Sequence, residues 1–182
     1  MVPVRTPNYF GRNAKIMDFA PFIICSHGER APRPRSMSTP HGLGDRMRTA
    51  AFAELQAKAA FAWAVDQFPD APQALRDKWT AQIADETRHY EMICRRMEEL
   101  GFELTGQTVS TALWESLKVC TTGREFCIRI ASAEERGRQA GVRLVNYLGK
   151  SDPQTAAIFQ EIVDDEVAHV ALAATFFDWV PE

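Results

Sequence analysis

The sequence predicts an all-α protein, an antiparallel four-helix bundle preceded by an extended N-terminal arm. Apolar residues recur at helical spacing after residue 44, and turn residues divide this part of the chain into four long segments. Two of these segments share one pattern, an acidic pair followed by histidine, in DETRH at 85–89 and DEVAH at 165–169. The chain has 182 residues, enough for one sizeable core. We therefore expect an arm over residues 1–44 and one bundle domain over 45–182.

The arm is rich in proline and in positive charge. It contains six of the ten prolines, so it cannot form a long helix. Residues 1–50 hold eight Lys or Arg and three Asp or Glu, net +5, whereas the remainder holds 13 against 21, net −8. No aromatic residues alternate with the basic ones as in nucleic-acid-binding segments. We expect the arm to dock on its own acidic bundle, and we do not expect nucleic-acid binding as the main function.

Turn residues set the ends of the first two helices. The first is expected from about Gly44 to Gln67, where the PDAP turn at 69–72 stops it. The second is expected from about Pro72 to Leu100, because Gly101 follows as a C-terminal stop signal. These two helices form the first half of the predicted bundle.

The second half follows a long crossover connection, in which a short helix is expected at about 112–120. The third long helix is expected over about 123–148, ended by Gly149. Pro153, just after a capping serine, opens the fourth helix, which is expected to reach about Trp179. No segment has a convincing strand pattern.

The repeated motif carries the chemistry. Glu86 and His89 stand three residues apart, as do Glu166 and His169, so each pair projects from one face of its helix. Both pairs lie within apolar stripes, where a carboxylate or an imidazole is costly to bury unless it is paired or bound to a metal. Two such pairs, with one inward glutamate from each of the other two helices, make the six-ligand set of a dinuclear metal site.

The remaining two ligands follow from helical phase. Glu54 is the only acidic residue between Asp45 and Asp66, and it lies in line with apolar residues of the first helix. The third helix offers Glu134 and Glu135 side by side. Glu134 shares its stripe with apolar residues, whereas polar residues crowd the side of Glu135, so Glu134 is the predicted ligand.

Three further residues are expected around the metals. Metal-bound histidines usually donate their second N–H to a carboxylate. Asp85 and Asp165 each precede a ligand glutamate, so we expect Asp85 to pair with His169 and Asp165 to pair with His89 across the bundle. Lys58, one turn after Glu54, is a candidate pocket cation for an acidic substrate; the alternative is that it extends to solvent at the bundle edge.

The order of the motifs resembles a known family. The chain carries, in sequence, AELQAKAAFAWAVDQFPDAP, ADETRHYEMICRRMEELG, EERG and DDEVAHVALA. These resemble the ELQA, PDAP, DExRH, ExRG and DExxHV motifs of an uncharacterised branch of the ferritin-like superfamily. The resemblance covers about residues 38–178 and implies a ferritin-like bundle. It also implies metal-ligand roles for the same six residues: Glu54, Glu86, His89, Glu134, Glu166 and His169.

Four carboxylates and two histidines suit two iron ions, or manganese or a mixed pair. We expect an O2-dependent di-iron oxidoreductase, a monooxygenase or related oxidase, that hydroxylates, desaturates or N-oxygenates a small organic substrate. Its electrons would come from an external reductase or reductant, since no CxxC pair provides a rubredoxin-type centre. One alternative is a peroxide-scavenging or iron-handling ferritin-like protein. Another is a tRNA-nucleoside hydroxylase, an activity known for a ferritin-like relative.

The composition indicates the cellular compartment in which this chemistry is expected. Four cysteines without a CxxC pair are typical of a reduced, cytoplasmic protein. No apolar run approaches the roughly 20 residues that span a bilayer, and no export signal is evident. We therefore expect no membrane partner. The sequence leaves a homodimer open.

Overall fold

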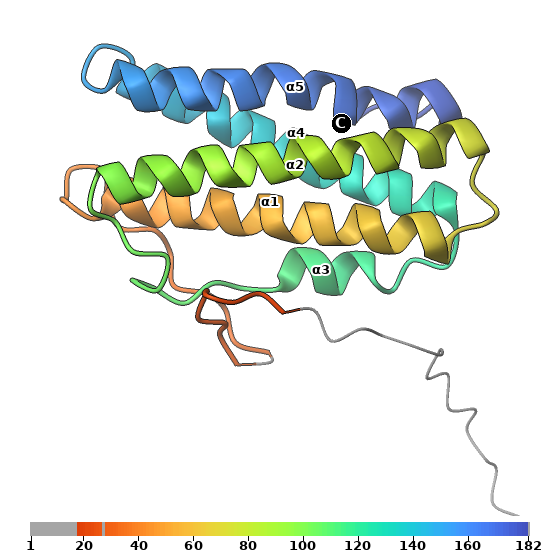
Figure 1. Cartoon of the computed structure of the whole chain (residues 1–182), viewed down its shortest axis with the longest axis horizontal. Helices are drawn as coiled ribbons and strands as arrows, with labels where there is room; N and C mark the ends of the chain where they lie inside the picture. The colour runs from red at the N-terminus through yellow and green to blue at the C-terminus, as the bar shows by residue number, and fades with distance from the viewer. Residues whose placement is uncertain (1–17, 27, 182) are drawn as a thin grey trace, which may run out of the picture.

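The computed structural model describes residues 18–26 and 28–181, and this part of the chain is all-helical. Five helices follow one another (Figure 1): α1 Gly42–Gln67, α2 Gln73–Glu99, α3 Ala112–Leu117, α4 Gly123–Leu148 and α5 Pro153–Phe177. The described ranges form no strand, and an isolated β-bridge joins Ile24 to Val109. None of the described helices combines the length and the apolar character that a membrane crossing requires.

The long helices form two hairpins. α1 packs along α2, and α4 packs along α5, with many more contacts within each hairpin than between the two. The crossover, residues 100–122, runs back along the bundle and carries α3, which lies against α1 (Figure 1). This route brings α2 beside α5 and α1 beside α4. The all-helical class and the paired packing agree with the predicted bundle.

The helices begin and end within one helical turn of the bounds expected from the sequence. Thr122 accepts a hydrogen bond from the backbone N–H of Glu125 at 3.1 Å, and Asp152 accepts one from Thr155 at 3.1 Å. These side chains satisfy N–H groups that have no partner inside the helix. Gly101 has a φ of +72°, a left-handed conformation that costs a residue with a β-carbon and therefore ends α2 cleanly.

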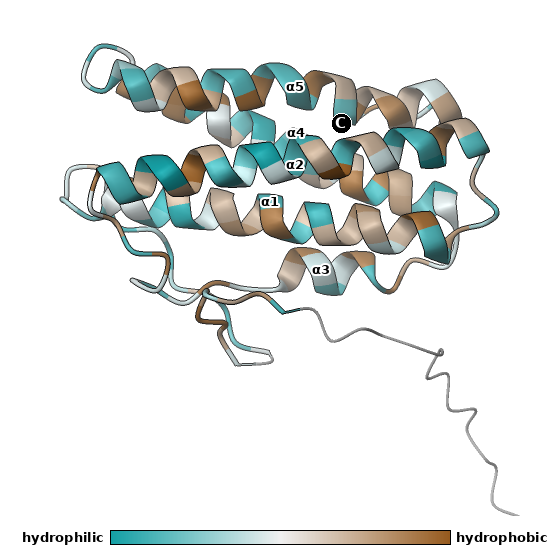
Figure 2. Ribbon diagram, in the orientation of Figure 1, coloured by the Kyte–Doolittle hydropathy of each residue, from teal (hydrophilic) through white to brown (hydrophobic). Residues whose placement is uncertain are grey.

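Two apolar clusters fill the bundle on either side of its middle. One is built around Trp79 and Phe126, whose ring centroids lie 5.1 Å apart. The other contains Met47, Phe52 and Ile93, all buried. Figure 2 shows polar and apolar residues alternating along the helices, the pattern of amphipathic segments that share a core. Polar groups at the middle are therefore shielded from water on both sides along the bundle axis.

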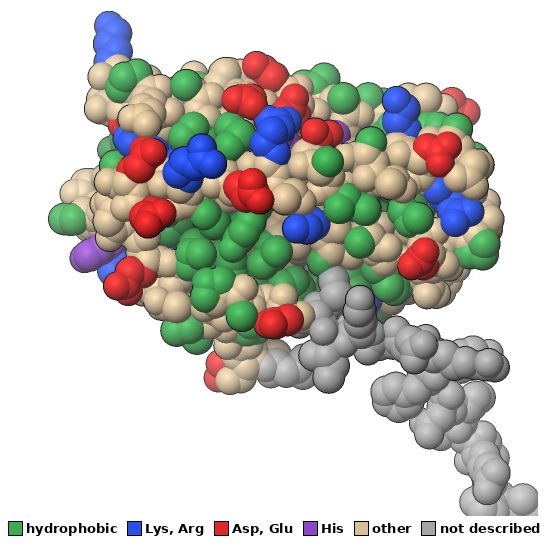
Figure 3. Space-filling model, viewed as in Figure 1, with side chains coloured by type: hydrophobic (Ala, Val, Ile, Leu, Met, Phe, Trp, Pro, Cys, Tyr) green, Lys and Arg blue, Asp and Glu red, His purple; other side chains and the backbone are tan. Residues whose placement is uncertain are grey.

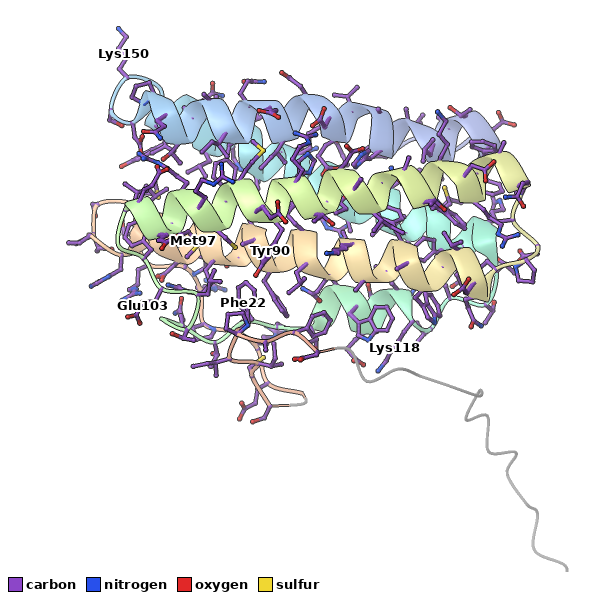
Figure 4. All side chains as sticks on the ribbon, viewed as in Figure 1. Phe22, Tyr90, Met97, Glu103, Lys118 and Lys150 are labelled. Atoms are coloured by element: carbon purple, nitrogen blue, oxygen red, sulfur yellow. The ribbon has the colours of Figure 1, made fainter. Side chains whose placement is uncertain are left out.

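The described part of the arm packs on the bundle. Phe22 contacts Phe52 with ring centroids 4.8 Å apart and lies below Tyr90 of α2 (Figure 4). The Cys25 N–H donates to the Val109 carbonyl, and the Val109 N–H donates to the carbonyl of Ile23, each at 2.9 Å. Beside this contact, apolar side chains remain at the surface among interspersed charges (Figure 3). Residues 1–17 of the predicted arm lie outside the described residues.

An ionic network around the buried Asp45 joins the arm to the start of α1. Asp45 accepts hydrogen bonds from Nε and Nη2 of Arg35, both at 2.7 Å, and from Nη1 of Arg48 at 2.9 Å. Arg48, with a side chain 5% exposed, also donates to the Glu103 carbonyl at the start of the crossover. Hydrogen bonding to Arg35 holds the pKa of Asp45 well below its usual value. The network therefore fixes the arm, α1 and the crossover together with opposite charges.

Candidate metal centre

The two repeated motifs face each other across the bundle. Glu86 and His89 of α2 are fully buried, and Glu166 and His169 of α5 are each 5% exposed. The two imidazole rings lie 6.2 Å apart between centroids. Because α2 and α5 run in opposite directions, the two motifs are arranged as approximate twofold equivalents.

α1 and α4 each add one glutamate to this group. Glu54 has a side chain 13% exposed, and Glu134 is buried. Glu135 points away and binds Arg138, with Nε to Oε2 at 2.7 Å and Nη2 to Oε1 at 2.8 Å. Of the two adjacent acids on α4, the structure thus brings Glu134 and not Glu135 into the bundle. The ion pair with Arg138 gives the physical reason, since Glu135 has a charged partner outside the cluster.

All six predicted ligands gather into two groups that share one residue. In each group the candidate ligand atoms lie within 4.8 Å of one another. The first group comprises Glu54, Glu86, His89 and Glu166, and the second comprises Glu86, Glu134 and His169. Glu86 belongs to both groups, the position of a carboxylate that bridges two cations. Each group also draws ligands from both hairpins.

Several ligand atoms of this cluster make no hydrogen bond, and the shortest imidazole–carboxylate contact among them is His169 Nδ1 to Glu86 Oε1 at 3.2 Å. Among the described residues, the buried side-chain atoms without a hydrogen bond include both carboxylate oxygens of Glu86, one oxygen each of Glu134 and Glu166, and Nδ1 of both His89 and His169. Unpaired buried polar atoms are rare, because leaving one unsatisfied costs about 1–3 kcal/mol. These atoms point at one another in the middle of the bundle, so the residues fit a pair of cations bound between them.

The electrostatics of the cluster also favour positive charge between these residues. Burial raises the pKa of Glu86 and of Glu134 well above the ordinary value, and neighbouring carboxylates add to the rise. Burial alone would lower the pKa of His169, but the carboxylates of Glu166 and Glu86 raise it to about 11. A cluster of this kind must hold positive charge, as protons or as metal ions.

The outer nitrogens of the histidines meet aspartates of the opposite motif. His89 Nε2 lies 3.0 Å from Oδ2 of Asp165, and His169 Nε2 lies 3.4 Å from Oδ2 of Asp85. These are the cross-bundle pairs expected from the sequence. A hydrogen bond donated by Nε2–H to each aspartate would leave Nδ1, which faces the cluster, as the ligand atom once a cation takes the place of its proton.

Arg88 connects the two aspartates. Its Nη2 lies 2.6 Å from Asp165 Oδ2 and 3.5 Å from Asp85 Oδ1, and its Nη1 binds Glu161 of α5. One guanidinium therefore holds both carboxylates that orient the histidines. Sequence reasoning did not single out Arg88, although its place three residues after Asp85 puts it on the same side of α2.

A cavity of about 580 Å³ adjoins the cluster between α1 and α4. All four glutamates of the cluster line it, and most other lining residues are apolar or small. Lys58 is not among the lining residues. The residues of α1 that line the cavity centre on Ala50, Ala53 and Ala57, and Lys58 lies about 100° around the helix from that face. Lys58 is partly exposed and lies away from the cavity, unlike the predicted pocket cation.

Comparison with known proteins places the chain in one family. Residues 13–182 match the family described as Protein of unknown function (DUF455). The chain belongs to DUF455. No curated protein and no solved structure matches this DUF455 chain.

Proposed function

We propose that this DUF455 protein is a ferritin-like, dinuclear non-haem iron enzyme that uses O2 to oxidise a small organic substrate. The observation that carries the proposal is the cluster of four carboxylates and two imidazoles in which Glu86 belongs to both ligand groups. That ligand set, drawn from all four long helices, is the arrangement of di-iron and di-manganese carboxylate proteins built on bundles.

The donor chemistry favours iron, with manganese or a mixed pair as the alternatives. Carboxylate oxygens with two imidazoles suit hard and borderline divalent ions, and they do not resemble a closed zinc site rich in cysteine. A pair of iron ions bound there would supply the redox change and the open coordination positions that dioxygen chemistry requires.

The residues of the chain have separate tasks in this proposal. Asp85 and Asp165 hold the proton on Nε2 of each histidine, and Arg88 fixes both aspartates. The apolar clusters at both ends exclude water, and the cavity between α1 and α4 admits the substrate to the edge of the cluster. In a hydroxylation, one oxygen atom of O2 enters the substrate. The other leaves as water, with two electrons from an external reductant and two protons.

Metal content after anaerobic reconstitution with Fe(II) tests the proposal. We expect about two irons per wild-type chain. The variant Glu134→Gln should retain less iron, whereas Glu135→Gln should retain as much as the wild type because Glu135 binds Arg138 at the surface. Equal iron in the two variants, or less than one iron per wild-type chain, would overturn the proposal.

Activity assays separate the alternatives. Oxygen uptake that yields an oxidised organic product supports the oxygenase, and the cavity beside the cluster favours it. Brisk peroxide consumption without such a product would instead support the peroxide-scavenging or iron-handling function. The nucleoside hydroxylase requires strong, salt-sensitive tRNA binding. Arg35 of the arm is bound to Asp45, so its charge is already engaged within the protein.

A further inference from the structure

The cavity beside the cluster is elongated along the bundle axis. From the glutamates it extends toward the start of α1 and the end of α4, where Arg46 and Arg143 are part of its lining. Arg46 stands eight residues before Glu54, and Arg143 stands nine residues after Glu134. At a helix rise of 1.5 Å per residue, the backbone positions of Arg46 and Arg143 lie roughly 12 and 14 Å along their helix axes from Glu54 and Glu134.

The wall between the glutamates and the arginines is apolar. It includes Ile162 and Val163, with Phe159 and Leu144 nearer the arginine end. Small residues of α4 keep the space open. Gly137 lines the cavity, and a Cβ added there would meet no atom within 4 Å. Gly137 is exposed, so a side chain at this position would occupy open space where the cavity meets solvent.

The charges of the lining are segregated. Its acidic residues are the four glutamates of the cluster, at one end. At the other end, Arg46 Nη1 donates to the carbonyls of Arg35 and Gly42, at 2.6 and 2.8 Å, and Nη2 makes no hydrogen bond within the described residues. Arg143 makes no ion pair within the described residues. Arg138, between the two ends, is neutralised by Glu135.

We propose that this cavity binds an elongated organic acid, with its carboxylate between Arg46 and Arg143 and its apolar chain extended toward the glutamates. Arginine pairs recognise carboxylates through charge-assisted hydrogen bonds, and the apolar wall suits methylene groups. The distance fits a chain of about eight to twelve carbons, given carbon–carbon bonds near 1.5 Å. The volume lies within the range of small-molecule sites, about 300–1,000 Å³.

The assignment deepens the proposed function, because the far end of the chain is the part that would be oxidised. Oxidation of the acid rests on the proposed function, whereas binding of the acid does not. The opposite orientation, with the carboxylate on the metals and the chain toward the arginines, is the competing arrangement. In that arrangement the arginines would contribute little to affinity.

Isothermal titration of the full chain with decanoate tests the proposal, on samples whose iron content has been measured. We expect decanoate to bind at least tenfold more tightly than decanol or decylamine. The double variant Arg46→Gln, Arg143→Gln should lose at least tenfold in decanoate affinity and little in decanol affinity. Arg124→Gln is the matched control, since Arg124 is an exposed arginine of α4 outside the cavity, and it should leave the affinity unchanged.

Filling the cavity provides an independent test. Gly137→Leu should weaken decanoate binding at least tenfold, and the smaller Gly137→Ala should weaken it less. Thermal unfolding checks that both variants fold. Decanol binding as tight as that of decanoate, an unaffected double arginine variant, or an unaffected Gly137→Leu would each overturn the assignment.

The measured iron content separates the two proposals. Iron-loaded protein that does not bind decanoate would overturn the ligand assignment and leave the proposed function standing. Protein that binds decanoate with the expected dependence on the arginines, but retains no iron, would overturn the proposed function and support the ligand assignment.

Discussion

Replacing Asp165 with asparagine should weaken metal binding more than the same change at Asp85. Asp165 lies 3.0 Å from His89 Nε2 and 2.6 Å from Arg88 Nη2, whereas the corresponding distances for Asp85 are 3.4 and 3.5 Å. Loss of a carboxylate behind a metal-bound histidine costs about 10–100-fold in affinity, which is about 1.4–2.8 kcal/mol. The shorter contacts place Asp165→Asn near the upper limit and Asp85→Asn near the lower one.

Competition with a chelator for Fe(II), measured anaerobically, gives the two dissociation constants. Asp164→Asn is the matched control, because Asp164 is an exposed neighbour that accepts a hydrogen bond from Gln160 at 2.8 Å. It should bind metal as the wild type does. Wild-type affinity in Asp165→Asn, or a greater loss in Asp85→Asn, would refute the reasoning that the aspartates act through the histidines.

Three further predictions concern stability. Asp45→Asn should lower the free energy of unfolding by about 3 kcal/mol at neutral pH, because Arg48 would stay buried without a charged partner; denaturant titration measures this. Because the pKa of Asp45 is depressed in the fold, its carboxylate contributes its full stabilisation above about pH 4, and this contribution is lost as the pH falls further. The difference in unfolding free energy between wild type and Asp45→Asn should therefore shrink in titrations at lower pH. Phe126→Ala should cost about 3–5 kcal/mol, because the ring packs against Trp79 in the core, and an equally stable variant in thermal unfolding would contradict that packing. Fe(II) at a hundred times its dissociation constant should add about 2.7 kcal/mol, which raises the melting temperature by roughly 5–11 °C. An unchanged melting temperature would show that the folded cluster does not bind the metal.

The helices could be predicted from the sequence because their signals are local. Helical periodicity gave the extent of each segment, and residues such as Gly101 and Pro153 gave the ends. The choice of Glu134 over Glu135 depended on phase alone, and the structure supplies the missing reason, the ion pair of Glu135 with Arg138. The metal and the reaction stay predictions.

Features that depend on the spacing between helices were harder to predict. The cavity exists because α1 and α4 make few contacts, and no local pattern records the distance between two hairpins. Lys58 was placed from its spacing to Glu54. It directly follows Ala57, which lines the cavity, and one residue along a helix rotates a side chain by about 100°, so Lys58 lies away from the cavity. Arg88 was missed because an exposed arginine on a helix normally indicates only a solvated surface.

In the proposed function, the division of the ligands between the hairpins would link metal release to separation of the hairpins. One hairpin supplies Glu54, Glu86 and His89, the other supplies the remaining three, and the backbones of the two hairpins approach each other less closely than the helices within each hairpin do. If the centre holds metal as proposed, separating the hairpins would divide the ligand set, so metal loss and hairpin separation would be coupled. Protein without iron would then be looser at the seam between the hairpins, where its amide protons would exchange faster while each helical pair stays intact.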